Sequence, residues 1–371
     1  MLEFKGRYND AKVFNANLDK VSTDQVYELL NNESFKDSKI RYMPDIHAGA
    51  GCTIGTTMTI TDKVVPNFVG VDIGCGVIFA KLKDKEIDFA KLDKVVRKFI
   101  PSGFAIRKTA TNVEESEPLV ENLRCLHKLK NSARFYTSIG SLGGGNHFIE
   151  VNKGSDGTLY LAIHSGSRNL GKQVCTYYQR LAISELRKTK GAKNFSQQSA
   201  YLQGELMDDY LHDMSLVQKY AQLNRRTMLD ILVDKMEFTV VDINETVHNY
   251  IEMETMILRK GAVSAKKGEI LIIPINMAYG SLLCEGKGNP DWNYSASHGA
   301  GRLMSRTKAK KEVCLKEFRS SMDGVYSTSV GRSTLDEAPM AYKDVSEIKR
   351  YMEPTVKILD VIKSVYNFKA N

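Results

Sequence analysis

The stretch VGVDIGCGVIFAKL, residues 69–82, joins two features that recur along the chain. Its first half is a string of small residues that contains Asp72 and Cys75. Glycine in such a string lets the backbone turn sharply and approach a ligand closely. Its second half, residues 76–82, is a run of β-branched and apolar residues and predicts a strand. The stretch therefore predicts a strand that begins directly after a turn bearing a carboxylate and a thiol.

Other parts of the chain also carry local secondary-structure signals. Strands are predicted from the runs GTTMTI, TLYLAIH and EILIIPI, at residues 55–60, 158–164 and 269–275. Residues 1–40 and 84–135 alternate charged and apolar residues in a helix-like fashion. Within the second region, residues 88–100 predict a helix that ends before Pro101.

The longest helical signal lies in the middle of the sequence. An apolar face is formed there by Leu206, Tyr210, Met214, Val217, Ala221, Met228 and Leu232. We interpret this segment as a core-packing helix, preceded by a polar surface loop at residues 187–198. Because strands and helices mix without a regular βαβ alternation, the sequence predicts a single α+β domain over residues 1–371.

The composition is that of a soluble globular enzyme. Hydrophobic residues make up 42% and charged residues 26% of the 371 residues, which excludes a disordered or collagen-like chain. The net charge of +8 is mild, so it permits an anionic partner such as nucleic acid without requiring one. No apolar run approaches the ~20 residues that a membrane-spanning helix needs.

The cysteines indicate a reducing environment. There are six, dispersed along the chain without a CxxC pair or a dense framework. The first residues, MLEFKGRYND, carry charges where a secretory signal would have an apolar core. We therefore expect a cytoplasmic protein in which a specialised cysteine is a metal ligand or a nucleophile.

Histidines recur inside the turn-like strings. Five of the seven lie in PDIHAGAG, GGGNHF, IHSGSR, VHNY and SHGAGR, at residues 44–51, 143–148, 163–168, 247–250 and 297–302. A single histidine of this kind is more often a hydrogen-bonded structural residue. Five together favour a shared functional site.

The donor types in these strings suit a metal ion. Asp72 and Cys75 can face one ion across a tight turn, and a thiolate can bridge two ions. With His147, His164 and His248 they supply one oxygen, one sulfur and three nitrogen donors. This mixture suits a borderline transition metal and not Mg²⁺ or Ca²⁺. By itself it suggests Zn²⁺ at least as readily as Mn²⁺, and it leaves open that Cys75 is a small buried apolar residue.

The segment GSRNLGKQ, residues 166–173, fits the phosphate-loop pattern GxxxxGK only in part. Gln173 stands where a working loop needs a hydroxyl to hold Mg²⁺. We interpret the segment as a strand-to-helix turn, with Arg168 and Lys172 as candidates for phosphate contact.

Taken together, the strings resemble a known family. The chain closely resembles the RtcB family of RNA ligases in VGVDIGCG, GGGNHFIE, IHSGSR, HNY, RKGAVSA, SHGAGRLMSRTKAKK and EAPMAYKD. The likeness extends from about Met43 to the C-terminal YNFKA, and SHGAGRLMSRTKAK is very specific. The resemblance implies a single compact α/β domain of the family's own type, with the active site in a deep central cleft.

The resemblance also implies a reaction. Family members join an RNA 3′-phosphate, or a 2′,3′-cyclic phosphate, to a 5′-hydroxyl, using GTP and Mn²⁺. The pathway opens any cyclic phosphate, guanylylates a histidine, passes GMP to the RNA 3′-phosphate and lets the 5′-hydroxyl displace GMP. The expected role is RNA repair or tRNA splicing.

Matching positions give expected roles to individual residues. The family pattern makes His298 the guanylylated nucleophile. It gives one Mn²⁺ to Asp72 and His147 and the other to His164 and His248, with Cys75 as the bridge. The positions that hold the guanine nucleotide are matched by Asn146, Phe148, Glu150, Asn249, Pro274, Ile275, Asn276, Met277, Ser281, Gly299, Ala300, Gly301 and Lys369. Among these, a Glu150 carboxylate can accept two N–H donors from a guanine edge, which favours GTP over ATP.

Two basic groups adjoin these strings. They are Arg306, Lys308, Lys310 and Lys311, and Arg259, Lys260, Lys266 and Lys267. A solvated helix face explains each of them about as well as RNA binding does, and their place beside the site leads us to expect RNA. The sequence departs from the family pattern at Ala50, where a lysine is usual, and at Ile275 and Asn276, which indicates a divergent branch.

Two other functions fit part of the sequence. A metal-dependent phosphoesterase would open cyclic phosphates without ligating, but it would not need His298 in its full string. A non-catalytic RNA-binding module would contain at most a structural metal, and five ligands shared by two ions exceed what such a site uses.

Overall fold

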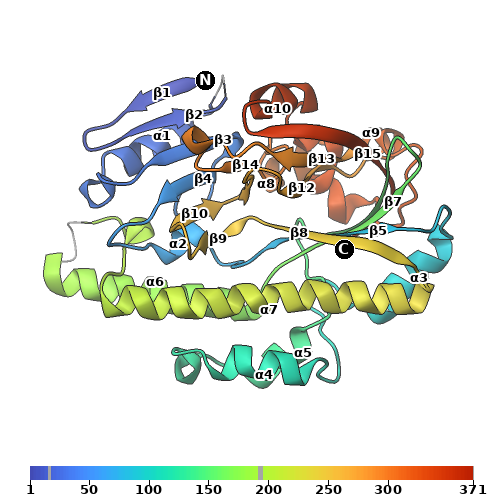
Figure 1. The fold of residues 1–371 in the computed structure, drawn as a ribbon, viewed down its shortest axis with the longest axis horizontal. Coiled ribbons are helices and arrows are strands. Elements are labelled where there is room, and N and C mark those ends of the chain that lie inside the picture. The colour runs from blue at the N-terminus through green and yellow to red at the C-terminus, as the bar shows by residue number, and fades with distance from the viewer. Residues whose placement is uncertain (16–17, 191–194, 371) are drawn as a thin grey trace.

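The computed structural model describes residues 1–15, 18–190 and 195–370. Within these residues the strands form a six-stranded, a two-stranded and a seven-stranded sheet, and two long helices run along one side of them (Figure 1). This arrangement confirms the predicted mixed α+β class. Among the described helices, none is both long and apolar enough to cross a membrane.

The six-stranded sheet contains the N-terminal part of the chain. Its order is β1 (Leu2–Lys5), β2 (Asp10–Val13), β3 (Ile40–His47), β4 (Ile54–Thr59), β10 (Ile257–Lys260) and β9 (Asn249–Glu252). Only α1 (Lys20–Leu30) and the short helix η1 (Glu33–Phe35) follow the helical prediction for residues 1–40, which was wrong for β1 and β2. Each of these strands is four residues long, too short for its two-residue alternation to stand out from a helical one.

The seven-stranded sheet is antiparallel throughout. Its order is β12 (Ile270–Asn276), β13 (Gly280–Gly286), β15 (Val356–Lys369), β6 (Phe148–Lys153), β7 (Leu159–Ser165), β5 (Gly76–Leu82) and β8 (Val240–Val247). The predicted strands at residues 76–82, 158–164 and 269–275 are confirmed to within one residue, and that at 55–60 corresponds to β4. Strand β5 lies between β7 and β8 and is buried at six of its seven positions, which explains its nearly continuous apolar sequence.

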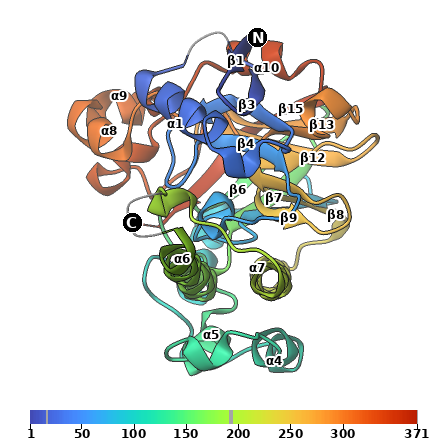
Figure 2. The same cartoon turned by 90° about the vertical axis from the view of Figure 1, so that its left-hand side faces the viewer.

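Two long helices, α6 (Arg168–Lys190) and α7 (Glu205–Met236), lie side by side beneath the sheets (Figure 2). The apolar face of α7 is buried as predicted, and it packs into one core cluster through Tyr210 and Met214 and into a second through Met228 and Leu232. The predicted loop at residues 187–198 was wrong at its start, because α6 continues to Lys190; residues 191–194 lie outside the described part.

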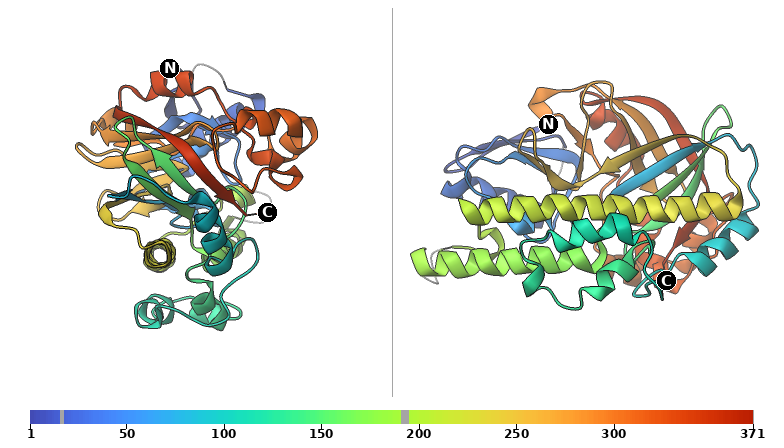
Figure 3. Two further views of the ribbon diagram at one scale, coloured as in Figure 1. Left: turned by 90° about the vertical axis from the view of Figure 1, so that its right-hand side faces the viewer. Right: turned by 60° about the horizontal axis from the view of Figure 1, so that its bottom comes forward.

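Shorter elements complete the fold. Helix α3 (Phe89–Phe99) begins after the capping residue Asp88 and ends before Pro101, as predicted. Helices α4 (Val113–Glu121) and α5 (Ala133–Ser138) lie on the outer side of the two long helices (Figure 3). The other elements are α2 (Pro66–Val69), β11 (Ala262–Ser264), β14 (Ser295–Ser297), α8 (Arg306–Glu312), α9 (Leu315–Ser321), α10 (Val345–Met352) and the short helices η2 (Leu126–Lys128), η3 (Gln197–Ser199), η4 (Pro290–Trp292), η5 (Arg332–Glu337) and η6 (Pro339–Ala341).

The turn that precedes β5 packs closely against α7. Gly74 has a φ of +70°, which favours glycine, and a Cβ at this position would lie 2.8 Å from the Cα of Gln218. The turn bearing Asp72 and Cys75 is therefore fixed between the long helix and the end of the sheet.

Candidate metal centre and active-site cleft

Strand register brings the predicted metal ligands together. Cys75 directly precedes β5, and β5 pairs with β7 so that Val77 lies opposite His164. On the other side of β5, Gly76 lies opposite Val247, and the next residue, His248, donates its backbone N–H to the Cys75 carbonyl at 2.9 Å. The end of one sheet thus positions ligand candidates from three neighbouring strands.

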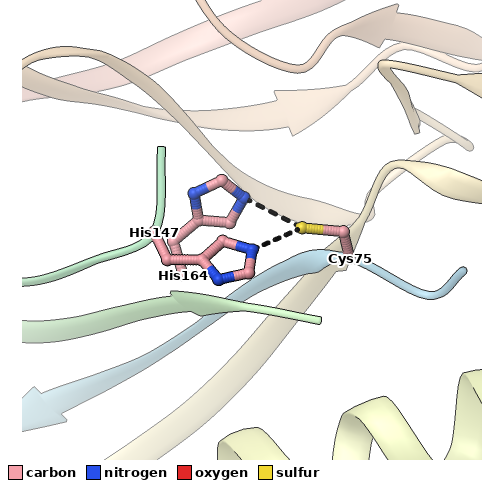
Figure 4. A group of neighbouring side chains, drawn as sticks. All are labelled: Cys75, His147 and His164. Atoms are coloured by element: carbon pink, nitrogen blue, oxygen red, sulfur yellow. Dashed lines mark hydrogen bonds between the residues drawn. The ribbon is translucent and has the colours of Figure 1, made fainter. Parts of the chain in front are cut away.

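The side chains converge around the Cys75 sulfur (Figure 4). Its Sγ lies 3.5 Å from Nε2 of His147 and 3.3 Å from Nε2 of His164. His164 Nε2 lies 3.0 Å from Nε2 of His248, and His147 Nε2 lies 3.0 Å from a carboxylate oxygen of Asp72. All five residues predicted from the donor types therefore form one cluster.

The protonation of the imidazoles follows from their other contacts. Nδ1 of His147 lies 2.8 Å from the Leu142 carbonyl, and Nδ1 of His164 lies 3.2 Å from the Asn146 carbonyl. Because a carbonyl oxygen can only accept, each Nδ1 carries the proton, and each Nε2 presents a lone pair to the cluster. Metal-bound histidines usually donate their second nitrogen in this way.

Burial shifts the pKa values of the clustered side chains toward their uncharged forms. Burial lowers the pKa of His164 well below its usual value and that of His248 to about 3, so both rings are neutral. Burial and the nearby Asp72 charge raise the pKa of the Cys75 thiol. A bound cation reverses this by stabilising the thiolate and pairing with the converging lone pairs. The donor set therefore fits a transition-metal ion.

Asp72 is fixed by the strand-to-helix turn at residues 165–168. One carboxylate oxygen accepts the Ser167 N–H at 3.0 Å, and a Cβ on Gly166 would lie 2.1 Å from that oxygen, so the close approach requires glycine. Burial would raise the pKa of Asp72, but its interaction with the adjacent His147 ring lowers it to about 2. This turn is the partial phosphate-loop match, which is confirmed as the join between β7 and α6.

His298 lies beside the metal cluster and is held by a buried carboxylate. Its ring centroid lies 4.9 Å from that of His248. Its Nδ1 lies 2.6 Å from Asp45 Oδ2, and the same oxygen accepts the backbone N–H groups of His298 and Gly299 at 3.1 and 3.2 Å. Asp45 is fully buried, which would raise its pKa, but the charge and hydrogen bond of His298 lower it. The carboxylate thus fixes the Nδ1–H tautomer and leaves Nε2 of His298 as the free nitrogen.

A cavity of about 310 Å³ opens beside His298, His248 and His164. Most of the residues predicted to hold the nucleotide line it: Asn146, Phe148, Glu150, Pro274, Ile275, Asn276, Met277, Gly299, Ala300, Gly301 and Lys369. Asn249 and Ser281 do not. Asn249 instead donates to the Asp72 carbonyl at 3.3 Å and accepts the Gly261 N–H, while Ser281 is fully buried in β13.

One wall of the cavity comes from the pairing of β6 with β15. Glu150 lies opposite Asn367 and Phe148 opposite Lys369, so residues two apart on each strand present their side chains on one face. Asn367 Nδ2 donates to Glu150 at 2.6 Å. Burial nevertheless raises the pKa of Glu150 to about 7, so this carboxyl changes charge near neutral pH.

Another buried carboxylate, that of Glu337, forms ion pairs with basic side chains that line the cavity. It pairs with Lys369, with Arg306 at 2.5 Å and with Arg302 at 3.5 Å, and these three residues line the cavity. Burial would raise the pKa of Glu337, but Lys369 and Arg306 lower it to about 2. Sequence reasoning gave no role to Glu337, although it lies in the string EAPMAYKD, nor to Asp45, although it lies in PDIH.

Two basic residues that were expected to contact RNA, Arg259 and Lys260, are buried inside the protein. Arg259 is fully buried, where it pairs with Glu252 at 3.3 Å. Lys260 is 6% exposed and donates to the carbonyls of Ala50 and Asn67. The RNA-binding prediction was wrong for Arg259 and Lys260, because both side chains are buried and bind to acceptor groups inside the protein.

The basic residues of α8 and of the turn after β7 differ in their surroundings. Lys308, Lys310 and Lys311 stay exposed on α8. Arg168, a candidate for phosphate contact, donates to the Ser141 hydroxyl at 3.2 Å and to the Gly103 carbonyl at 3.0 Å, whereas Lys172 is exposed.

Comparison with known proteins identifies the family of the chain. Residues 29–370 match the family model described as tRNA-splicing ligase RtcB. The chain is 31% identical to the RNA-splicing ligase RtcB of Escherichia coli K12, over 93% of this chain and 94% of that protein. It is 28% identical to the Mycobacterium tuberculosis RNA-splicing ligase RtcB (82% and 90% covered) and 27% identical to the Aeropyrum pernix tRNA-splicing ligase RtcB (82% of each). The family model and the Escherichia coli relative both span nearly the whole chain, and the chain therefore belongs to the RtcB family of RNA-splicing ligases.

Proposed function

We propose that this protein is a GTP- and Mn²⁺-dependent RNA ligase that joins RNA 3′-phosphate or 2′,3′-cyclic phosphate ends to 5′-hydroxyl ends. Its role would be RNA repair or tRNA splicing. The observation that carries the proposal is the position of His298. One ring nitrogen is fixed by buried Asp45, and the ring lies against the metal cluster at the cavity.

The cluster suits two ions that share the Cys75 sulfur. The sulfur lies 3.5 Å from His147 and 3.3 Å from His164, while Asp72 contacts His147 and His248 contacts His164, so Asp72 and His147 would hold one ion and His164 and His248 the other. When bound, such cations neutralise negative charge that develops on phosphate oxygens and leaving groups. The choice of Mn²⁺ over Zn²⁺ rests on the family resemblance.

His298 would attack the nucleotide through Nε2. The nitrogen forms a bond to the α-phosphorus of GTP, and the bond from that phosphorus to pyrophosphate breaks. Asp45 holds the Nδ1 proton throughout and stabilises the positive charge that the ring acquires. The product is a phosphoramidate, in which GMP is linked to the ring.

The RNA 3′-phosphate then takes the GMP group. Its oxygen attacks the guanylate phosphorus, and the N–P bond to His298 breaks. The 5′-hydroxyl next attacks the 3′-phosphate phosphorus, loses its proton and displaces GMP. This activation is needed because a phosphate monoester has no good leaving group, whereas GMP is one.

The cavity offers contacts for the guanine and the phosphates of the nucleotide. Glu150 can accept from the guanine edge, as the resemblance implies, and Arg302, Arg306 and Lys369 supply positive charge for phosphates. We propose that the nucleotide is held by these residues and by Asn146, Phe148, Asn249, Pro274, Ile275, Asn276, Met277, Ser281, Gly299, Ala300 and Gly301. Asn249 and Ser281, which do not line the cavity, would act through the segments that they support.

Guanine-nucleotide affinity is expected to rise with pH. A pKa of about 7 for Glu150 means that the ionised, accepting form grows about tenfold between pH 6 and pH 8, so the dissociation constant for GTP falls by a similar factor. Lys369 and Asn367 face this carboxyl, and both lower its pKa against the effect of burial. Titrations of the wild type and of Glu150→Gln across this range provide the measurement. A wild-type slope that persists in Glu150→Gln would contradict the assignment.

Asp45→Asn is expected to slow guanylylation by about 10²–10⁴-fold while leaving metal binding intact. Asparagine keeps the shape but can donate from its amide, which disfavours the Nδ1–H tautomer of His298. Single-turnover formation of the protein–GMP adduct measures the effect. Asp291→Asn, on an exposed ion pair with Lys12, is the matched control. Equal rates for Asp45→Asn and the wild type would show that Asp45 has no such role.

The proposed function is tested with an RNA that carries a 2′,3′-cyclic phosphate and a separate RNA with a 5′-hydroxyl. With GTP and Mn²⁺, the expected results are a joined RNA and a transient acid-labile GMP adduct on the protein. ATP in place of GTP should give neither. Opening of the cyclic phosphate without joining or adduct would favour the phosphoesterase, and no reaction of either kind would favour a binding module.

A further inference from the structure

Two consecutive polar residues on α7, Asn224 and Arg225, are completely buried although neither lines the cavity. Polar side chains in such a place need specific partners, because burial without hydrogen bonds is costly. Their partners are backbone and side-chain groups of four separate chain segments, and each segment bears or adjoins a residue of the proposed metal centre.

Asn224 joins two of these segments. Its Oδ1 accepts the backbone N–H groups of Gly140 and Ser141 at 2.9 and 3.1 Å. Its Nδ2 donates to the Ser141 carbonyl at 3.2 Å, to the Ser165 hydroxyl at 3.1 Å and to the Gly166 carbonyl at 3.0 Å. One side chain thus ties the turn before His147 to the end of β7.

The connection continues directly to the ligands. The Ser165 hydroxyl donates to the Leu142 carbonyl at 2.8 Å, and the same carbonyl accepts from His147 Nδ1. Ser165 also follows His164 in sequence. The orientation of the His147 ring and the position of His164 therefore depend on the same small network.

Arg225 adds two further segments. Its Nη1 donates to the Gly74 carbonyl at 2.6 Å and to the Ser165 carbonyl at 2.7 Å, and its Nε pairs with Glu245 at 2.6 Å. Gly74 directly precedes Cys75, and Glu245 lies on β8, three residues before His248. The guanidinium fork therefore connects the Cys75 turn, the end of β7 and the strand that leads to His248.

Burying Arg225 costs free energy, and a contribution to folding stability does not explain why the residue is there. Arg225 is fully buried with one partner carboxylate, and its Nη2 has no hydrogen-bond partner within the described residues. Buried ion pairs can often be replaced by well-packed apolar residues without loss of stability. A role in orienting the metal ligands explains the Arg225–Glu245 pair better, because an apolar residue could not hold those segments by hydrogen bonds.

We propose that Asn224 and Arg225 are positioning residues that set the distances between the ligand-bearing segments and thereby the metal affinity. The inference rests on the metal centre of the proposed function but not on the guanylylation chemistry. Neither residue is assigned any contact with metal, nucleotide or RNA.

The test measures Mn²⁺ affinity and folding stability separately. Arg225→Lys keeps the charge but lacks the planar fork that reaches two carbonyls and Glu245. Asn224→Ala removes the hydrogen bonds of Asn224, and alanine is a good helix former, so α7 itself should be kept. Both are expected to weaken Mn²⁺ binding by about 10–100-fold, the effect typical of residues that orient metal ligands. Arg226→Met is the matched control, since Arg226 is the next residue on α7 and pairs with exposed Asp230 at the surface.

The outcomes decide between positioning and mere stabilisation. Folded variants that unfold at lower urea concentration in the metal-free state, yet bind Mn²⁺ as the wild type does, would overturn the proposal. Failure of both variants to fold would also overturn the proposal, because it would show that Asn224 and Arg225 are needed for folding itself. A wild type that binds Mn²⁺ but forms no GMP adduct would refute the proposed ligase chemistry and leave this comparison of affinities valid.

Discussion

Replacing His298 with alanine is expected to eliminate the covalent GMP adduct and to lower RNA joining by at least ~10³-fold. The adduct needs a nitrogen nucleophile at the cavity, and His298 is the imidazole whose Nδ1 is fixed by a buried carboxylate there. Mn²⁺ binding should be unchanged, because the Nε2 contacts within the metal cluster belong to His147, His164 and His248.

The measurement is incubation with labelled GTP and Mn²⁺, followed by detection of label on the denatured protein. His127→Ala, at an exposed histidine on η2, is the control and should retain the adduct. Wild-type labelling of His298→Ala would place the nucleophile elsewhere. Opening of a cyclic phosphate by His298→Ala would remain possible, since that step does not require the adduct.

Cys75→Ala is expected to remove metal and activity together. Its sulfur lies 3.5 and 3.3 Å from Nε2 of His147 and His164, which the proposal assigns to different ions, so a bridging thiolate would serve both ions. Loss of a shared ligand should weaken Mn²⁺ binding at both positions by more than about 100-fold, beyond what loss of a supporting residue causes. Adduct formation should fail as a result.

Metal content after gel filtration, measured beside adduct formation, tests this prediction. Cys284→Ala removes another buried thiol, on β13, and should keep its full metal content. If Cys75→Ala retained both ions, the sulfur could not be their bridge. If it lost only one, Cys75 would be a ligand of a single ion.

The local parts of the fold could be predicted from sequence because their signals lie within a few residues. Strand β5 is a continuous apolar run, and α7 repeats its apolar positions over many turns. The metal-ligand candidates could be grouped because aspartate, cysteine and histidine in glycine-rich turns are unusual. Their order along the chain gave no distances, which come from the pairing of β5 with β7 and β8.

The contacts that were missed join distant parts of the chain. Asp45 and His298 are separated by 253 residues, and only the meeting of β3 with the turn after β14 brings them within 2.6 Å. Arg259 was misinterpreted for a related reason. The sequence alone does not show whether a basic side chain is free to bind RNA. Here Glu252, on the neighbouring strand β9, forms an ion pair with Arg259.

Strand β15 has a consequence for how the protein is made. It pairs with β13 on one side and with β6 on the other, so it joins the β12–β13 hairpin to the β6–β7–β5–β8 half of the larger sheet, and it supplies Asn367 and Lys369. Until residues 356–369 pair with β13 and β6, each of those strands has an unpaired edge and the cavity wall is incomplete. Such edges promote aggregation, so the pairing of β15 both completes the binding wall and protects the chain from self-association.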